Sequence, residues 1–324
     1  MLATSCSNFL NIDNYFDDEF SIDSVFTNAR YMEAYMWGAA AMFPDEAQTI
    51  RNGYTPGPMA TDEGVNGLTG SGTANIYHGM DFANGKITQD FLGDGSPNLN
   101  QWGKYYKIIR KCNSILQNLD RPKDLTNSER LRLEGYTRFI RAFAYYNLLV
   151  DYGPAILLGD EVVNTNEPIE YYDRPRATYD ETMNYTCEEF EKGARLLPSP
   201  KDVSTLDFGR PTKGAALGLV ARLRLIHASP LFNGGPVASS YFGNWKRKTD
   251  GVHYVSQQYD ESRWAVAAAA AKRVMDMGAY KLYTYAKDDN TPELPAGATS
   301  DPNFYDAYPN GANAVSYTHL TLPT

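Results

Sequence analysis

Residues 101–119, with the sequence QWGKYYKIIRKCNSILQNL, carry the clearest structural pattern in the chain. Apolar side chains recur at alternating intervals of three and four residues, at Trp102, Tyr105, Ile109, Cys112, Leu116 and Leu119. An α-helix repeats about every 3.6 residues, so this spacing places all of them on one face. The stretch therefore predicts an amphipathic helix with a buried apolar face, on which Cys112 is a small hydrophobe and not a redox group.

The same periodicity predicts further helices on both sides of this stretch. They are expected at about residues 24–42, 129–150, 178–197, 212–229 and 260–278. Two begin with capping-box spacing, Thr126 to Glu129 and Thr178 to Glu181, and Pro211 suits the first turn of another.

Successive helices of this kind predict an all-α fold of antiparallel pairs stacked into a superhelix. Residues 44–100 and 230–259 are rich in Gly, Asn, Pro and Tyr, and are expected to be long loops. Long ordered loops in a compact helical protein usually carry function.

Composition excludes several classes of protein. The 324 residues are 43% hydrophobic, which is too much for a disordered chain, and no apolar run is long enough for a membrane-spanning helix. The net charge is −9, so a nucleic-acid partner is not expected. The cysteines Cys6, Cys112 and Cys187 form neither a disulfide framework nor a zinc motif.

Small residues lead into a cysteine at the start of the chain, in Leu2-Ala3-Thr4-Ser5-Cys6. This pattern is typical of the end of a bacterial lipoprotein signal, in which the cysteine is lipidated, although so short a string also arises by chance. No basic or apolar region precedes it, which indicates a fragment or a start assigned late. Lipidation of Cys6 would hold the domain at a membrane surface through the tether formed by residues 7–21.

Longer motifs follow one another along almost the whole chain. They are Cys6–Ile12, Val25–Thr27, Gly57–Glu63, Trp102–Asn113, Arg138–Tyr146, Trp264 and Gly278–Leu282. The most specific block reads GRPTKGAA at Gly209–Ala216 and continues to ASPLFNGG at Ala228–Gly235. In this order the motifs resemble the SusD/RagB family of outer-membrane glycan-binding lipoproteins.

The resemblance implies a right-handed superhelix of tetratricopeptide-like helix pairs, with long loop insertions that form a shallow glycan site. It implies capture of oligosaccharides or polysaccharides at the cell surface and their delivery to a SusC-like TonB-dependent transporter, with no chemistry on the sugar and no cofactor. The predicted localisation is the outer membrane, lipid-anchored and surface-exposed.

The resemblance also divides the chain. Residues 1–5 are interpreted as a residual signal peptide, 6–21 as the lipid-anchor tether, and 22–310 as the SusD-like helical domain. Family members continue well beyond this length, so the domain is expected to be incomplete at its C-terminus. Residues 311–324 match nothing in the family and are interpreted as a non-native tail.

A sugar ring presents an apolar C–H face and a rim of hydroxyls, so its site needs aromatic platforms and polar groups at their edges. The candidate glycan-binding residues in the loops are Asn66, Tyr77, Tyr241 and Trp245. The same loops also hold Asp62, Glu63, Asn75, His78, Asn84, Asn233, Phe242 and Tyr254. The alternative is that the aromatic residues only pack their loops onto the helical scaffold.

Other conspicuous residues are assigned structural roles. Trp102 and Trp264 lie on helix faces and are expected in the core. Arg210 and Lys213 stand before a helix, where they are expected to brace neighbouring carboxylates or helix carbonyls.

No catalytic or metal-binding motif is present in the sequence: nucleophile elbow, P-loop, dinucleotide fingerprint and H-E-x-x-H are all missing. Residues 84–87 imitate an EF-hand, but Met80, Phe82 and Phe91 occupy its ligand positions. Two alternatives to glycan capture remain. One is an all-helical glycoside hydrolase, which needs two carboxylates roughly 5–10 Å apart. The other is a helical-repeat scaffold that binds protein partners.

Overall fold

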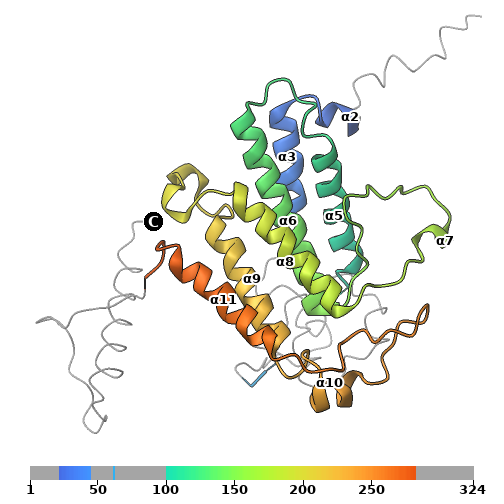
Figure 1. Ribbon diagram of the computed structural model, residues 1–324. Coiled ribbons are helices and arrows are strands. Elements are labelled where there is room, and N and C mark those ends of the chain that lie inside the picture. The colour runs from blue at the N-terminus through green and yellow to red at the C-terminus, as the bar shows by residue number, and fades with distance from the viewer. Residues whose placement is uncertain (1–21, 45–60, 63–99, 282–324) are drawn as a thin grey trace, which may run out of the picture. The chain divides into compact units, whose positions relative to one another are not determined.

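The computed structural model describes residues 22–44, 61–62 and 100–281 (Figure 1). These residues are helical and contain no β-strand, only an isolated antiparallel bridge between Lys246 and His253. The chain divides into two compact units, Met1–Val274 and Met275–Thr324. The elements below belong to the first unit, apart from the last residues of its final helix. No helix among the described residues is long and apolar enough to span a membrane.

Four long helices form the centre of this unit. They are α5 (Trp102–Gln117), α6 (Asn127–Tyr152), α8 (Tyr179–Leu196) and α9 (Lys213–Ala228). Each packs against the next in sequence, and α3 (Ala29–Ala40) packs against α5. Figure 1 shows the chain reversing direction between successive helices, as in tetratricopeptide-like pairs. The predicted all-α class is confirmed.

Shorter elements connect and flank these helices. They are α2 (Ile22–Val25), α7 (Ile169–Tyr172), α10 (Gly235–Phe242), α11 (Ser262–Asp276) and the 3-10 turns η5 (Pro200–Asp202) and η6 (Thr205–Asp207).

Both predicted capping boxes are present. The Thr126 hydroxyl accepts from the Glu129 N–H at 3.3 Å while the Glu129 carboxylate accepts from the Thr126 N–H at 2.9 Å, and Thr178 and Glu181 repeat the arrangement at α8. The start of α9 differs from expectation. Thr212 is its N-cap, so Pro211 precedes the helix instead of forming its first turn.

Of the six residues predicted on the apolar face, four are buried, namely Tyr105, Ile109, Cys112 and Leu119, and Trp102 and Leu116 are half-buried. Tyr136 of α6 and Tyr179 of α8 also lie in the core. Cys112 and Cys187 lie within this core, where burial raises the pKa of each thiol to about 12. Both cysteines therefore remain protonated thiols at neutral pH and act as small hydrophobes, as predicted for Cys112.

Helices α6 and α8 approach closely because glycines meet at their crossing. A Cβ at Gly135 would lie 2.9 Å from the Leu196 Cβ, and one at Gly193 would lie 3.2 Å from the Gly135 carbonyl oxygen. Any larger residue at Gly135 would force the two backbones apart.

A buried arginine joins α5, α6 and α8. Arg141 and Glu189 are each 1% exposed, and the Arg141 Nη2 donates to the Glu189 Oε2 at 2.5 Å. The Arg141 Nη1 donates to the Asn113 Oδ1 at 2.7 Å and to the Asp160 Oδ1 at 2.6 Å. Lys192 also donates to Glu189, at 2.8 Å. These hydrogen bonds explain why polar residues stand at buried positions of three helices.

Arg210 braces its surroundings as predicted. Its guanidinium pairs with Asp207 at 3.0 Å and with Glu33 at 3.3 Å, and it stacks over the Trp37 ring at 5.0 Å. Lys213 is exposed at the first position of α9.

Two predicted elements have different boundaries in the structure. The helix expected at residues 24–42 is divided into α2 and α3, because the Asn28 side chain caps the second helix by accepting from the Arg30 N–H at 2.9 Å. The loop expected at residues 230–259 contains α10.

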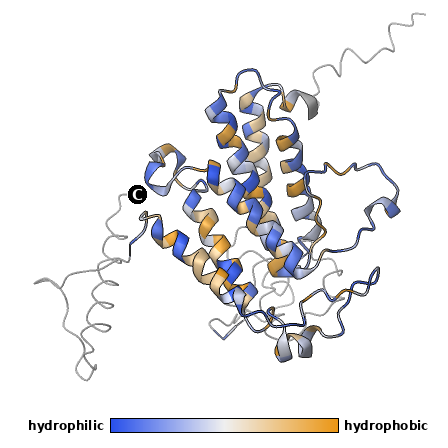
Figure 2. Cartoon of the chain, viewed as in Figure 1, coloured by the Kyte–Doolittle hydropathy of each residue, from blue (hydrophilic) through white to orange (hydrophobic). Residues whose placement is uncertain are grey.

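Trp264 of α11 is not in the core, contrary to expectation. Trp264 is 39% exposed and Ala268 is also exposed, whereas Ala267 and Ala270 are buried. Alanines stand on every side of this helix, and Figure 2 shows hydrophobic residues distributed along both α9 and α11. Periodicity could not select the buried side, because the apolar residues do not form a single stripe.

Candidate functional site

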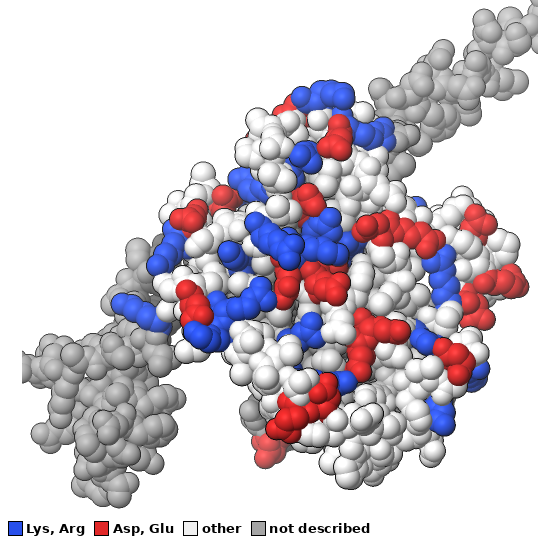
Figure 3. All heavy atoms as spheres, viewed as in Figure 1, with Lys and Arg blue, Asp and Glu red and all other residues white. Residues whose placement is uncertain are grey.

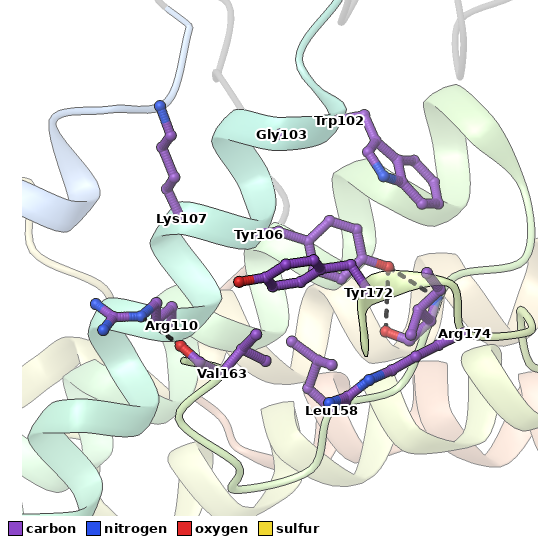
Figure 4. Close-up of a pocket in the computed structure, with 10 residues that line it drawn as sticks. Trp102, Gly103, Tyr106, Lys107, Arg110, Leu158, Val163, Tyr172 and Arg174 are labelled. Carbon is purple, nitrogen blue, oxygen red and sulfur yellow. Dashed lines mark hydrogen bonds between the residues drawn. The ribbon is translucent and has the colours of Figure 1, made fainter. Parts of the chain in front are cut away.

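A cavity of about 290 Å³ opens at the end of the unit where α5 begins and α6 ends (Figure 4). The Gln101 N–H donates to the Tyr152 hydroxyl at 2.8 Å and so ties these two helix ends together. The cavity, called the aromatic pocket below, is lined by Trp102, Gly103, Tyr106, Lys107, Arg110, Ile156, Leu158, Val163, Tyr172 and Arg174.

Helix α5 supplies one wall of the aromatic pocket from a face beside its buried stripe. Trp102, Tyr106 and Arg110 are spaced four residues apart and therefore lie along one side of the helix. The Tyr106 hydroxyl accepts from the Ile156 N–H at 2.7 Å and donates to the Ile156 carbonyl at 3.1 Å. The Arg110 Nε donates to the Val163 carbonyl at 2.8 Å. These bonds hold the segment after α6 against α5.

Burial raises the pKa of Tyr106 far above its ordinary value. Its hydroxyl therefore stays protonated and keeps both backbone hydrogen bonds across the ordinary pH range. The ring is fixed as a wall of the pocket, and its hydroxyl is not available as an acid or base.

The opposite wall is formed around α7. The Tyr172 hydroxyl donates to the Asn164 carbonyl at 2.8 Å and accepts from the Glu167 N–H at 3.1 Å. Figure 4 shows the Tyr172 ring on the pocket side, with Leu158 and Val163 nearby. The ring is thus oriented by hydrogen bonds at its rim while part of its apolar surface stays exposed.

An ion pair supports this wall. The Arg174 guanidinium donates to both Glu161 carboxylate oxygens, at 2.6 and 2.8 Å, and the Tyr171 hydroxyl donates to Glu161 at 2.8 Å. The hydrogen bonds from Arg174 and Tyr171 lower the pKa of Glu161 to about 2. The carboxylate is therefore ionised at neutral pH and orients Arg174 by a bidentate contact.

Trp102 is not in the core, contrary to expectation. It is half-buried and lines the aromatic pocket, with its ring 5.1 Å from that of Tyr106 and edge-on to Tyr152 at 5.5 Å. The Arg176 guanidinium covers the ring at 4.6 Å. Trp102 is the first residue of α5, so no preceding helical turn covers it, and the pattern that buries Tyr105 does not bury Trp102.

A second recess of about 840 Å³ adjoins the first, and Arg174 lines both. This recess, called the basic groove below, is lined by Asp173, Arg174, Pro175, Arg176, Trp245, Lys246, Arg247, Lys248, Thr249 and Tyr254. The Trp245 ring packs 4.9 Å from that of Tyr254. It also reaches Gly153, where φ is +76° and a Cβ would lie 3.4 Å from the indole.

The structure describes two of the four predicted glycan-binding residues, and only one of these two lines a recess. Asn66 and Tyr77 lie outside the described residues. Tyr241 is 74% exposed on α10 and lines neither recess, whereas Trp245 lines the basic groove. Their contact with a sugar remains a prediction.

The other loop residues named as candidates also differ in their positions. Tyr254 lines the basic groove, but Asn233 is buried and its amide donates to the Ala228 and Asp260 carbonyls at 3.2 and 2.9 Å, which is a structural role. Asp62 is exposed. Glu63, Asn75, His78, Asn84 and the lipidation candidate Cys6 lie outside the described residues.

Sequence reasoning missed Tyr106, Arg110, Tyr172 and Arg174 as site residues. The four-residue spacing of Trp102, Tyr106 and Arg110 was the one available signal, because it marks a second aromatic and polar face of the same helix. Nothing local marks Tyr172 and Arg174, which reach the pocket through contacts between segments distant in sequence.

The aromatic pocket is suited to binding a ligand that has an apolar face and polar groups at its rim. It offers aromatic faces together with the polar groups of Lys107, Arg110 and Arg174. Among the described residues that line it there is no carboxylate, whereas a glycosidase needs a pair of them. Within residues 22–44, 61–62 and 100–281, no cluster of His, Cys, Asp and Glu could hold a metal ion.

Comparison with known proteins identifies the family. Residues 13–225 match the family SusD-like_3, described as starch-binding associating with outer membrane. The chain belongs to this SusD-like family. Members of the family bind carbohydrate and are not catalytic. No curated protein matched this SusD-like chain in a sequence comparison.

Solved structures share the fold of this SusD-like protein. That of BT4246 aligns with a TM-score of 0.62 and 25% identity over 86% of this chain and 46% of its own. A SusD homologue from Bacteroides thetaiotaomicron VPI-5482 aligns with a TM-score of 0.55 and 16% identity over 81% of this chain and 44% of its own. The SusD-like chain thus spans about half the length of these solved structures.

The family match includes one recess fully and the other only in part. All residues that line the aromatic pocket lie within residues 13–225, whereas Trp245–Thr249 and Tyr254 of the basic groove lie beyond that range. The wall formed by Trp245–Tyr254 is therefore a feature of this SusD-like chain that the family match does not cover.

Proposed function

We propose that the protein is a surface-exposed lipoprotein of the outer membrane that captures oligosaccharides and delivers them to a SusC-like TonB-dependent transporter. The observation that carries the proposal is the aromatic pocket, in which Trp102, Tyr106 and Tyr172 line a cavity with polar groups at its edge. Because Tyr106 and Tyr172 are held by hydrogen bonds to the backbone, their positions are set before a ligand arrives. The family description, starch binding at the outer membrane, supports the same class of ligand.

The size of the aromatic pocket limits what it can hold. Its volume of about 290 Å³ lies at the lower end of small-ligand sites, which span roughly 300–1,000 Å³. We infer that it holds a short segment of a glycan, with the apolar faces of the sugar against the aromatic rings and the hydroxyls toward Lys107, Arg110 and Arg174.

Isothermal titration with maltoheptaose and a panel of plant and host glycans tests this function. Trp102→Ala is expected to weaken binding at least about tenfold, equivalent to about 1.4 kcal/mol, because it removes the widest aromatic face. Trp264→Ala is the matched control, since Trp264 is exposed on α11 and lines neither recess. Failure to bind any glycan, or equal affinities for the two variants, would contradict the proposal.

Anchoring and delivery need separate experiments. In cells, Cys6→Ser is expected to move the protein from the membrane fraction to the soluble fraction, because the acyl chains attach at that thiol. Co-purification with a SusC-like transporter from outer membranes tests delivery. Membrane attachment that persists in Cys6→Ser would contradict the anchor, and recovery without any such transporter would contradict the partner.

A further inference from the structure

The basic groove has a charge opposite to that of the protein as a whole. The chain carries a net charge of −9, yet the groove is lined by Arg174, Arg176, Lys246, Arg247 and Lys248 against one acidic residue, Asp173. On the face that Figure 3 shows, Lys and Arg are interleaved with Asp and Glu. A local excess of cations in an acidic protein indicates a specific anionic ligand, because a general polyanion is repelled by the rest of the surface.

Part of this positive charge is already neutralised by internal partners. Arg174 makes its bidentate contact with Glu161, and Arg247 pairs with Asp250 at 2.6 Å and with Glu181 at 3.6 Å. These arginines are therefore held in place but have little net charge left for a ligand.

The positive charges of Arg176, Lys246 and Lys248 are not paired with a carboxylate of the described residues. The Arg176 Nη1 donates to the carbonyls of Tyr152 and Pro154, at 3.2 and 3.5 Å, and makes no ion pair within the described part of the chain. Lys246 and Lys248 are exposed, and neither pairs with a carboxylate among the described residues. An anion in the groove would find three cations that are paired with no carboxylate of the described residues.

The basic groove adjoins the aromatic pocket. Arg174 lines both recesses, and Arg176 lines the groove while its guanidinium stacks on Trp102 of the pocket. The Arg247 Nη1 donates to the Arg176 carbonyl at 3.3 Å, which joins the two sides of the groove. Trp245 and Tyr254 add aromatic surface to it. A chain of sugars held in the pocket therefore extends into a surface that combines aromatic rings with cations.

We propose that the basic groove binds the anionic substituents of a glycan, carboxylate or sulfate, so that the preferred ligand of the protein is an acidic polysaccharide. This inference rests on the proposed glycan-binding function. The guanidinium of Arg176 is suited to a planar carboxylate or to a tetrahedral sulfate. The two lysines provide point charges on flexible side chains, which can adjust to the position of the ligand. The neutral sugar rings are held by the aromatic pocket, and the anionic groups select the polymer.

Titration of the full chain against matched glycans tests the inference. One arm compares galacturonan oligosaccharides with their carboxyl-reduced counterparts, and a second compares carrageenan oligosaccharides with their desulfated counterparts. In at least one arm the charged ligand is expected to bind about tenfold tighter than its neutral match, with a preference that falls as salt rises. The arm that shows the preference identifies carboxylate or sulfate as the recognised group.

Charge-removing variants then locate the effect. Lys246→Gln/Lys248→Gln is expected to abolish the preference and to leave affinity for the neutral ligand within about twofold, because neither lysine lines the aromatic pocket. The matched control is Lys123→Gln/Lys201→Gln, which removes the same charge from exposed lysines outside both recesses. An unchanged preference in the groove variant, or an equal loss in the control, would overturn the assignment.

Further outcomes separate this inference from the function on which it rests. Trp102-dependent binding with equal affinity for charged and neutral glycans overturns the inference and leaves glycan capture intact. Absence of binding to every glycan overturns both. Inorganic polyphosphate that binds as tightly as the charged glycans would indicate a general anion site and would also overturn the inference.

Discussion

Two arginine–glutamate pairs with similarly short contacts occupy opposite environments. Arg141 and Glu189 are each 1% exposed between α6 and α8, whereas the side chains of Arg174 and Glu161 are 27% and 42% exposed beside the aromatic pocket. Both pairs have donor–acceptor distances of 2.5 to 2.8 Å. The difference in burial determines what each pair contributes.

The buried pair is required by the fold, and the exposed pair positions the site. Two charges removed from water must compensate each other, so the loss of either partner is costly. Charges near the surface are solvated in any case, and their pairing adds little to stability. The Arg174–Glu161 pair instead orients the segment that carries Tyr171 and Tyr172.

The largest expected effect follows from breaking the buried pair. Arg141→Ala is expected to lower the free energy of unfolding by up to about 3–5 kcal/mol, because Glu189 stays buried and keeps only its weaker contacts with Lys192 and Arg138. Denaturant unfolding measures the loss, with Arg174→Ala as the matched control at about 0–1 kcal/mol. If Arg141→Ala does not fold, Arg141→Met/Glu189→Leu provides the test, since removal of both charges is expected to restore much of the stability. Similar losses of stability for Arg141→Ala and Arg174→Ala would contradict the expected difference between the buried and the exposed pair.

Acidification is expected to lower the free energy of unfolding by a smaller amount. Burial alone would raise the pKa of Glu189, but the charge of Arg141 and hydrogen bonds from Lys192 and Arg141 outweigh it and hold the pKa below its ordinary value. A lowered pKa contributes stability that is present above the ordinary carboxyl pKa and is lost as pH falls through the lowered one.

Unfolding measured between neutral pH and about pH 3 checks this dependence. Glu189→Gln is expected to flatten the loss of stability below the ordinary carboxyl pKa. Glu161→Gln should act in the same direction but more weakly, because its carboxylate is more exposed and better screened. A steeper dependence in Glu189→Gln would contradict the direction of the shift.

Breaking the exposed pair is expected to have the smallest effect on stability. It is also expected to weaken glycan binding. Glu161→Gln should change the free energy of unfolding by less than about 1 kcal/mol and weaken glycan binding several-fold, because Arg174 and Tyr171 lose the carboxylate that orients them. Titration and unfolding of the same preparation measure both quantities. An unchanged affinity would show that the pair does not organise the pocket.

Local signals made much of the helical core predictable. The capping boxes at Thr126 and Thr178 involve residues three apart, so they mark helix starts without reference to the rest of the molecule. The spacing of Tyr105, Ile109 and Cys112 likewise selects a buried face whatever helix covers it. The same reasoning did not apply to α11, whose alanines leave several faces equally apolar.

The site was less predictable, because its residues meet only after folding. Tyr106 and Arg110 on α5 hydrogen-bond to the backbone of Ile156 and Val163. Every residue type has a backbone carbonyl, so the sequence does not show which residues accept these bonds. Trp102 was assigned to the core because it continues the apolar stripe, although its place at the first turn leaves it half-buried.

By itself, the sequence determined the all-α class, the helix starts with capping boxes, the burial of Cys112 and the family resemblance, because each depends on neighbours in the chain or on ordered motifs. Only the tertiary structure decided which aromatic residues line a pocket, that Arg174 connects it to the basic groove, and which arginines are already neutralised. These properties depend on distances between segments far apart in sequence, and spacing along the chain does not encode such distances.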